Sequence, residues 1–163
     1  MSLMVTELVN IINKQLDIYN YLIGLSDEKR EAIISNDVND LKKLTELENK
    51  LIEQNLTQEK SRLSLIEDIA LVLNHDPFDL TISKLLTLIE GTEGYDDLLI
   101  VSKEMRKSIE LLKEANDKNR ILIDNSLEFI DYSINAIRST YNESPAVDID
   151  SAGNTRPLFD VTS

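Results

Sequence analysis

The chain has 163 residues, 42% of them hydrophobic and 29% charged, which is the balance of a single helical domain with a substantial core. Its 4 glycines, 3 prolines and 5% aromatic residues argue against a β-sandwich, which needs many turns and aromatic or β-branched strands. The net charge of −13 makes nucleic acid and anionic membranes poor partners, and it also serves solubility. The sequence holds no cysteine, which excludes disulfides, thiol catalysis and thiolate metal sites.

The beginning of the chain bears on its location. No apolar run approaches the ~20 residues that a membrane-spanning helix needs, and no signal peptide opens the sequence. We therefore expect a cytoplasmic protein. The opening Met1-Ser2-Leu3, which precedes a second Met4, resembles an expression-vector remnant, so the predicted fold starts after it.

Two long helices are predicted in the first half of the chain. Apolar residues recur at three- and four-residue steps over 4–35, and the pattern resumes over 38–74. Asp37 is the predicted N-cap of the second helix, and Asp40 supports its first turn. Polar residues interrupt the apolar face in the middle of this helix, where we expect a partly solvated segment. These residues are Glu48, Asn55, Glu59 and Arg62.

The second half begins with a short helix and ends with a very long one. Pro77 ends the preceding helix, and Thr81 is the predicted cap of a short helix that runs through Glu90. A turn over 91–94 leads to a helix over 95–141, about 70 Å long, which needs either the other long helices or a partner to cover its apolar face. Its predicted seam consists of Leu98, Val101, Met105, Ile109, Leu112, Asn116, Asn119, Ile123, Ser126, Ile130, Ile134, Ile137 and Tyr141.

The predicted fold class is therefore all-α. Short connections between three long helices and one short helix favour an antiparallel up-and-down bundle, which would form one domain over 4–141. Periodicity stops after Tyr141, and Pro145, Gly153 and Pro157 would break any helix. We expect residues 142–163 to form a flexible tail.

The sequence offers no catalytic arrangement. His75 is the only histidine and lies in a predicted loop, so neither a nucleophile–histidine pair nor a zinc-binding helix can be built. Gly91 and Gly94 lack the lysine of a phosphate-binding loop, and the calcium-like stretch that begins at Asp148 lacks its later ligands. We predict a protein that is not an enzyme and uses neither a metal nor a cofactor.

The last third of the long C-terminal helix is the predicted partner-binding region. Its apolar residues form two separate lines, so the helix either packs against two neighbours or leaves one line for a partner helix. The alternative is that all of them belong to the bundle core. The predicted partner-binding residues are Leu122, Ile123, Leu127, Phe129, Ile130, Ile134, Ile137 and Tyr141.

Two amides lie one helical turn apart on the otherwise apolar stripe of the same helix. Asn116 and Asn119 are predicted to fix the register of the bundle, as a buried asparagine does in a coiled coil, by pairing with Asn55, Gln58 or Arg62. Direct contact with a partner is the alternative role.

These features together resemble the FlgN family of flagellar export chaperones. The resemblance rests on Tyr21-Leu22-x-x-Leu25-x-x-x-Lys29-x-x-Ala32-Ile33, on Asp40-Leu41-x-x-Leu44-x-x-x-Glu48-x-x-Leu51, and on Glu59-x-x-Arg62. Its most specific part is Leu111-Leu112-x-x-x-Asn116-x-x-Asn119-x-x-Leu122-Ile123 with the apolar helix that follows. The similarity covers about 4–145.

The resemblance implies a specific function. FlgN-like proteins bind the amphipathic C-terminal helices of the hook-filament junction proteins FlgK and FlgL, prevent premature assembly and deliver these proteins to the flagellar type III export gate. The family binds its substrates toward its C-terminal helix, which agrees with the partner-binding region predicted here. The alternative is a self-associating structural or adaptor bundle, such as a homodimer, without a role in export.

Overall fold

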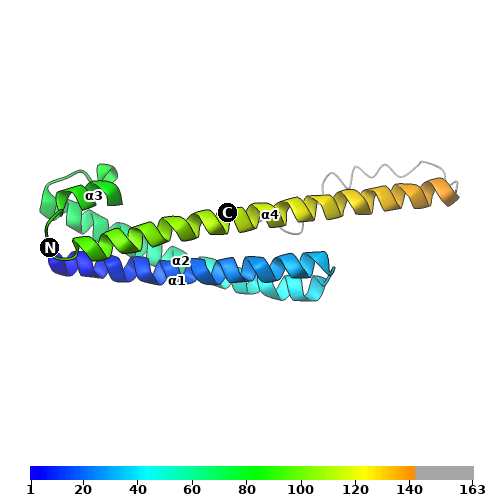
Figure 1. Ribbon diagram of the computed structural model, residues 1–163, viewed down its shortest axis with the longest axis horizontal. Coiled ribbons are helices and arrows are strands. Elements are labelled where there is room, and N and C mark those ends of the chain that lie inside the picture. Colours follow the sequence, from blue (N-terminus) through cyan, green and yellow to red (C-terminus); the bar gives the residue numbers. More distant parts are fainter. Residues whose placement is uncertain (142–163) are drawn as a thin grey trace.

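The computed structural model describes the backbone of residues 1–141 and the side chains of 1–125, 135 and 136. The chain forms α1 (Ser2–Ile34), α2 (Val38–Leu73), the 3-10 turn η1 (Pro77–Asp79), α3 (Ile82–Leu88) and α4 (Tyr95–Tyr141). Figure 1 shows three long helices lying side by side, with α3 at one end. The predicted all-α bundle of three long helices and one short helix is confirmed. The predicted tail, 142–163, lies outside the described residues.

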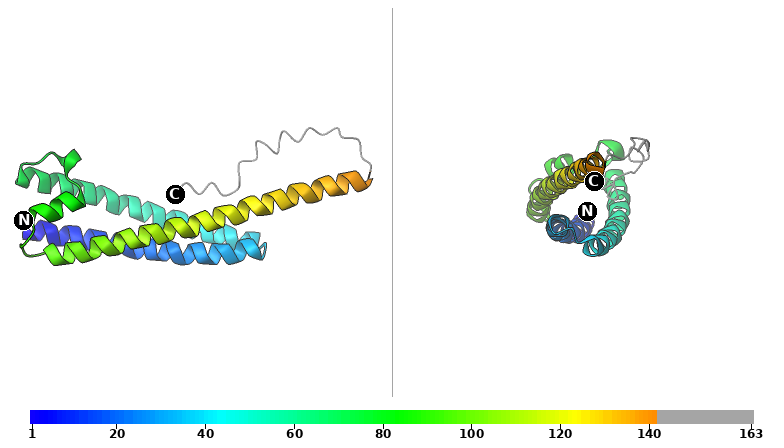
Figure 2. Two further views of the ribbon diagram at one scale, coloured as in Figure 1. Left: turned by 45° about the horizontal axis from the view of Figure 1, so that its top comes forward. Right: turned by 90° about the vertical axis from the view of Figure 1, so that its right-hand side faces the viewer.

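Helix α1 is the central element of the bundle. Both α2 and α4 pack along it, whereas the described parts of α2 and α4 do not approach one another closely. The end-on view in Figure 2 shows α2 and α4 diverging from α1. One long side of the bundle is therefore lined by α2 and α4 and has α1 at its base.

In each long helix a series of buried and half-buried residues follows alternating steps of three and four, which is the seam of a coiled coil. Along α4 this seam passes through Ser108 and Ala115, whereas Ile109 is 44% exposed and Asn116 is half-buried. The predicted seam was one residue out at Ile109, because the steps from Val101 to Met105 and from Met105 to Ile109 are both four, which leaves the 3.5-residue period. Asn116 lies beside the seam residue Ala115. In α1 the seam consists of Val5, Leu8, Ile12, Gln15, the half-buried Tyr19, Leu22, Ser26, Lys29 and Ile33.

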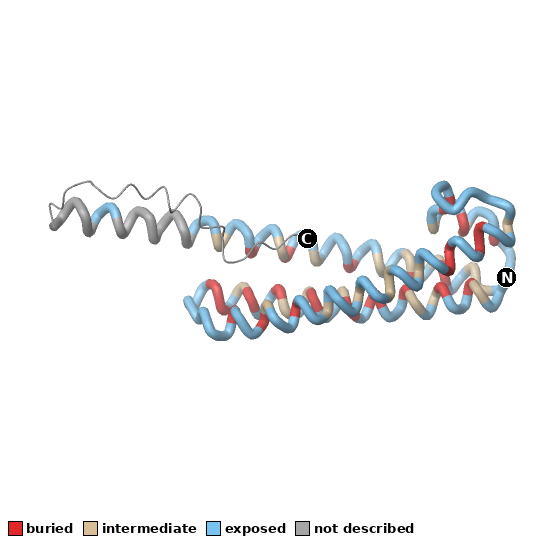
Figure 3. Tube along the Cα trace, turned by 180° about the vertical axis from the view of Figure 1, so that it is seen from behind, coloured by how far each residue is buried: buried red, intermediate tan, exposed pale blue. Residues whose placement is uncertain are grey.

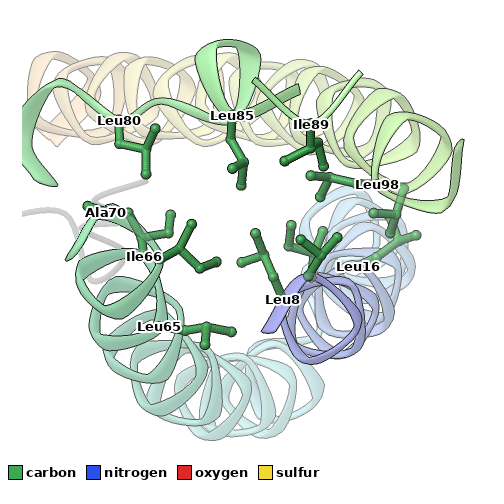
Figure 4. Close-up of a cluster of buried hydrophobic side chains, with 13 residues drawn as sticks. Leu8, Leu16, Leu65, Ile66, Ala70, Leu80, Leu85, Ile89 and Leu98 are labelled. Atoms are coloured by element: carbon green, nitrogen blue, oxygen red, sulfur yellow. The ribbon is translucent and has the colours of Figure 1, made fainter. Parts of the chain in front are cut away.

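The main apolar core lies at the end of the bundle where α3 packs. Figure 4 shows Leu8 of α1, Ile66 of α2 and Leu98 of α4 converging beneath Leu85 of α3. Leu8, Leu85 and Leu98 are fully buried. The short helix therefore fills a fourth position in the bundle, but only at this end.

The turn before α4 lies close to the first helix, with Gly94 against Val5. Gly94 has φ +93°, and a Cβ atom there would lie 3.0 Å from Cγ1 of Val5. Glycine therefore supplies both the left-handed backbone and the room for Val5. The predicted turn over 91–94 is confirmed, since Gly91 also has a positive φ of 78°.

The helix ends follow most of the predicted signals. The Asp37 side chain accepts a bond from Asp40 N at 3.0 Å, and Thr81 Oγ1 accepts one from Lys84 N at 3.1 Å, so both predicted caps are confirmed. The exclusion of the first three residues was wrong, because α1 begins at Ser2 and Val5 N donates to Met1 O. The turn η1 was not predicted, and α3 ends at Leu88 rather than Glu90.

A second, smaller core closes the opposite end of the α1–α2 hairpin. It consists of Ala32 and Ile33 from α1 and Leu41 and Leu44 from α2. Buried positions recur along the packed helices between the two cores (Figure 3), but several of them are polar. The two apolar cores are thus joined by a polar middle section.

Candidate partner-binding surfaces

Helix α4 extends well past the turn that joins α1 to α2, as Figure 1 shows. The helical backbone continues through Tyr141, so 126–141 adds 16 residues, or about 24 Å, beyond the last described core contacts. Asn135 and Ala136 are exposed in this segment. Six predicted partner-binding side chains lie outside the described residues, namely Leu127, Phe129, Ile130, Ile134, Ile137 and Tyr141.

The other two predicted partner-binding residues, Leu122 and Ile123, lie on the bundle. Both are half-buried and pack against the cluster formed by Ala32, Ile33 and neighbouring residues of α2. In this structure the core of the hairpin therefore continues to Ile123, into the predicted partner-binding region. A role of Leu122 and Ile123 in binding a partner stays a prediction.

The two amides of α4 converge on one serine of α1. Asn119 Nδ2 donates to Ser26 O at 2.7 Å and to Ser26 Oγ at 3.0 Å, and Ser26 Oγ donates to Asn116 Oδ1 at 3.3 Å. Asn119 and Ser26 are buried, and Asn116 is half-buried. The predicted pairing with Asn55, Gln58 or Arg62 was wrong, because the seam of α4 faces α1 and not α2.

A buried ion pair joins α1 to α2 near the hairpin turn. Lys29 Nζ lies 3.2 Å from both carboxylate oxygens of Glu48, and the two side chains are 3% and 8% exposed. The prediction that Glu48 belongs to a partly solvated segment was wrong, because Lys29 compensates its charge inside the seam. A buried pair of this kind is costly to break, since the remaining charge would be left without a partner.

A polar network crosses from α1 to α2 in the middle of the bundle. Gln15 Nε2 donates to Glu59 Oε2 at 2.8 Å, and Arg62 binds both oxygens of the same carboxylate. Asn55 Nδ2 donates to the Tyr19 hydroxyl at 3.4 Å. The bond from Arg62 holds the pKa of Glu59 below its ordinary value, although burial acts to raise it, and the bond from Gln15 lowers it further.

A groove runs along the side of the bundle where α2 and α4 diverge. Its first section, of about 400 Å³, begins at Ile82 of α3, and its second, of about 470 Å³, continues to Arg120. Tyr19, Asn55 and Ile109 line both sections, so the two form one continuous channel. The base of the channel comes from α1, and its walls come from α2 and α4.

Two chemical features are absent from the part of the chain that the structure describes. It contains no group of three or more His, Asp or Glu side chains that could hold a metal ion. None of its helices is long and apolar enough to cross a membrane.

Comparison with known proteins identifies the family. A family model described as "FlgN protein" matches residues 1–146, which is most of the chain. The chain belongs to the FlgN family. No curated protein and no solved structure gives a significant match.

Membership of the FlgN family assigns a general role in flagellar export as a chaperone. The match spans all four helices, so the buried ion pair, the Ser26 contact and the groove all lie within the FlgN region. Sequence reasoning did not predict that Lys29 and Ser26 are buried between the helices. The signal that could have found both is the alternation of three- and four-residue steps, which runs through Leu22, Ser26, Lys29 and Ile33.

Proposed function

We propose that this FlgN-family protein is a cytoplasmic chaperone for the hook-filament junction proteins FlgK and FlgL. It covers the amphipathic C-terminal helices of these clients, keeps them from assembling early and delivers them to the flagellar export gate. The observation that carries the proposal is the family match over residues 1–146.

The extension of α4 supports the proposed binding mode. An amphipathic helix that runs past its own bundle offers a partner anchor points at i, i+3, i+4 and i+7. The segment 126–141 is helical and carries the apolar residues Ile130, Ile134 and Ile137 at such spacings. A client helix laid along it would be shielded from other client molecules.

The proposal assigns binding rather than catalysis. In the described part of the chain the charged seam residues, Lys29 with Glu48 and Glu59 with Arg62, neutralise one another in pairs. The release of a client at the gate requires a reversible complex, and an interface of modest area satisfies that requirement better than a large, sealed one.

The direct test is gel filtration of the protein with a C-terminal fragment of FlgK at tens of micromolar. We expect co-elution, and we expect Ile130→Asp and Ile137→Asp each to weaken binding by about 10-fold or more, since each places a charge in an apolar contact. Asn135→Asp, at an exposed position of the same segment, is the matched control and should leave the affinity unchanged. Deletion of 142–163 should weaken binding less than either isoleucine substitution.

Two results would contradict the proposal. Separate elution of the wild-type protein and the fragment would remove FlgK as a client. Unchanged affinity in both isoleucine variants would remove the end of α4 as its binding site. A stable dimer that excludes the fragment would instead favour the self-associating adaptor.

A further inference from the structure

The bundle has four positions around its axis, and only three of them are filled along most of its length. At one end α3 fills the fourth position and packs Leu85 and Ile89 into the main core. No described segment occupies this fourth position past Ile82, which is the first residue of α3. The groove between α2 and α4 begins at Ile82. The groove therefore occupies the position that a fourth helix would take.

The side chains around the groove suit the apolar face of a helix. Ile52 and Leu56, one turn apart on α2, are 38% and 56% exposed, and Ile109 on the α4 wall is 44% exposed. Tyr19 and Leu22 of α1 lie at the base. The polar groups nearby are already bonded, as in the pairing of Asn55 with Tyr19, so they do not require a polar ligand.

The α4 wall also carries a line of three positively charged residues. Arg106, Lys113 and Arg120 line the groove at seven-residue intervals and so lie on one face of the helix. Arg106 donates to Ser83 Oγ at 3.3 Å, and neither Lys113 nor Arg120 has an ion-pair partner among the described residues. Asp117 is the acidic residue on this wall. In a chain of net charge −13, such a line of cations favours an acidic partner.

We infer that the groove between α2 and α4 receives an amphipathic helix of a client, with acidic residues at seven-residue spacing along its α4 side. The docked helix completes a four-helix bundle in line with α3. The α2 wall from Glu48 to Arg62 is about 21 Å long and the α4 wall from Ser102 to Arg120 is about 27 Å, so the groove holds about 14–18 helical residues. This inference rests on the proposed function, because the helix belongs to a chaperone client, but it concerns a surface separate from 126–141.

A second copy of the chain is a poorer occupant. In a two-fold symmetric dimer the same surface of each subunit faces its counterpart. The line of Arg106, Lys113 and Arg120 would then lie near the same cations of the other copy, and like charges in contact weaken association.

The test measures binding of the C-terminal FlgK fragment to the full-length protein by isothermal titration calorimetry at two salt concentrations. Lys113→Glu/Arg120→Glu reverses two charges of the groove wall, and we expect it to weaken binding by at least about 10-fold and to reduce the salt dependence. Lys107→Glu/Lys118→Glu is the matched control, because it makes the same change in charge on the exposed face of α4 outside the groove. It should change the affinity less than about twofold. Ile109→Asp should weaken binding about 10-fold through the apolar contact.

Each other outcome has a definite meaning. Equal affinities for the groove variant and its control, with wild-type binding intact, would overturn the inference and leave the proposed function standing. A wild-type protein that does not bind the fragment would overturn the proposed function and remove the client from the groove. Self-association that Ile109→Asp abolishes would assign the groove to a second copy, and tighter binding by a 1–141 protein would assign it to the chain's own tail.

Discussion

The two ends of the bundle are stabilised in different ways. At the α3 end four segments contribute aliphatic side chains to one core, and Leu8, Leu85 and Leu98 are fully buried. Toward the hairpin turn only α1, α2 and α4 remain, and the seam carries Ser26 and the pair formed by Lys29 and Glu48. The α3 end is a closed apolar core, whereas the hairpin end combines a smaller apolar core with a few specific polar contacts.

This difference teaches how stability and binding are separated along one rod. Burial of apolar surface is strong and has no preferred direction, so the α3 end can hold the helices together without fixing their axial positions. A buried charge pair or a buried amide tolerates only one partner position, so it selects a register. The groove begins beside the closed core, at Ile82, and runs toward the hairpin end, and the α4 extension lies past that end.

The largest expected effect comes from breaking the ion pair near the hairpin turn. Lys29→Met leaves the Glu48 carboxylate buried without its partner, and we expect the free energy of unfolding to fall by about 4 kcal/mol. Urea denaturation measures this change. Lys29→Met/Glu48→Leu should recover most of the loss, since it removes both charges, and Arg30→Met, which breaks the exposed pair with Asp27, should cost less than about 1 kcal/mol. A loss in Lys29→Met no larger than in Arg30→Met would contradict this account of the buried ion pair.

A smaller effect is expected at the apolar end. Leu8→Ala creates a cavity at a fully buried position, and we expect it to cost about 3 kcal/mol in urea denaturation. The control is Leu71→Ala, at a leucine that is 82% exposed, which should cost less than about 0.5 kcal/mol. Amide hydrogen exchange sharpens the comparison, because Leu8→Ala should lower protection throughout the bundle and Lys29→Met mainly near the hairpin turn. The same pattern of protection loss in both variants would remove the distinction between the ends.

The smallest effect concerns pH in the middle section. The pKa of Glu59 is lowered in the folded protein, so its ionised form stabilises the fold at pH values above its ordinary pKa, near 4.5. That contribution is lost as the pH falls through the lowered pKa. We expect the urea midpoint of Glu59→Gln to lie below that of the wild type at neutral pH and to approach it as the solution is acidified below pH about 4. A difference between the two that does not change with pH would contradict this role of the Glu59 charge.

The sequence predicted the elements of this fold well because each is specified locally. The caps at Asp37 and Thr81 and the turn at Gly91 and Gly94 depend on residues within four positions of one another. Apolar periodicity then places one face of each helix toward the others. These signals do not depend on how one helix slides along the next.

The contacts between helices could not be predicted in the same way. Asn119 was identified as an unusual residue, but its partner, Ser26, lies 93 residues away in sequence. To predict Ser26 rather than Asn55 as the partner of Asn119, one must know that α4 packs on α1 and how far the two helices are displaced along their axes. The Lys29–Glu48 pair was missed because the sequence does not show which residue of the first helix lies opposite Glu48, and only their opposition across the hairpin makes them a buried pair.

The placement of the chain's first residue has a practical consequence for experiments on single molecules and surfaces. Met1 lies at the α3 end of the rod, and the end of α4 lies at the other, as Figures 1 and 2 show. A protein anchored to a sensor chip by its N-terminus would therefore point the end of α4 into solution. A dye at Ser2 paired with one at the exposed Asn135 would report the full length of the rod, and a bend anywhere in α4 would shorten that separation.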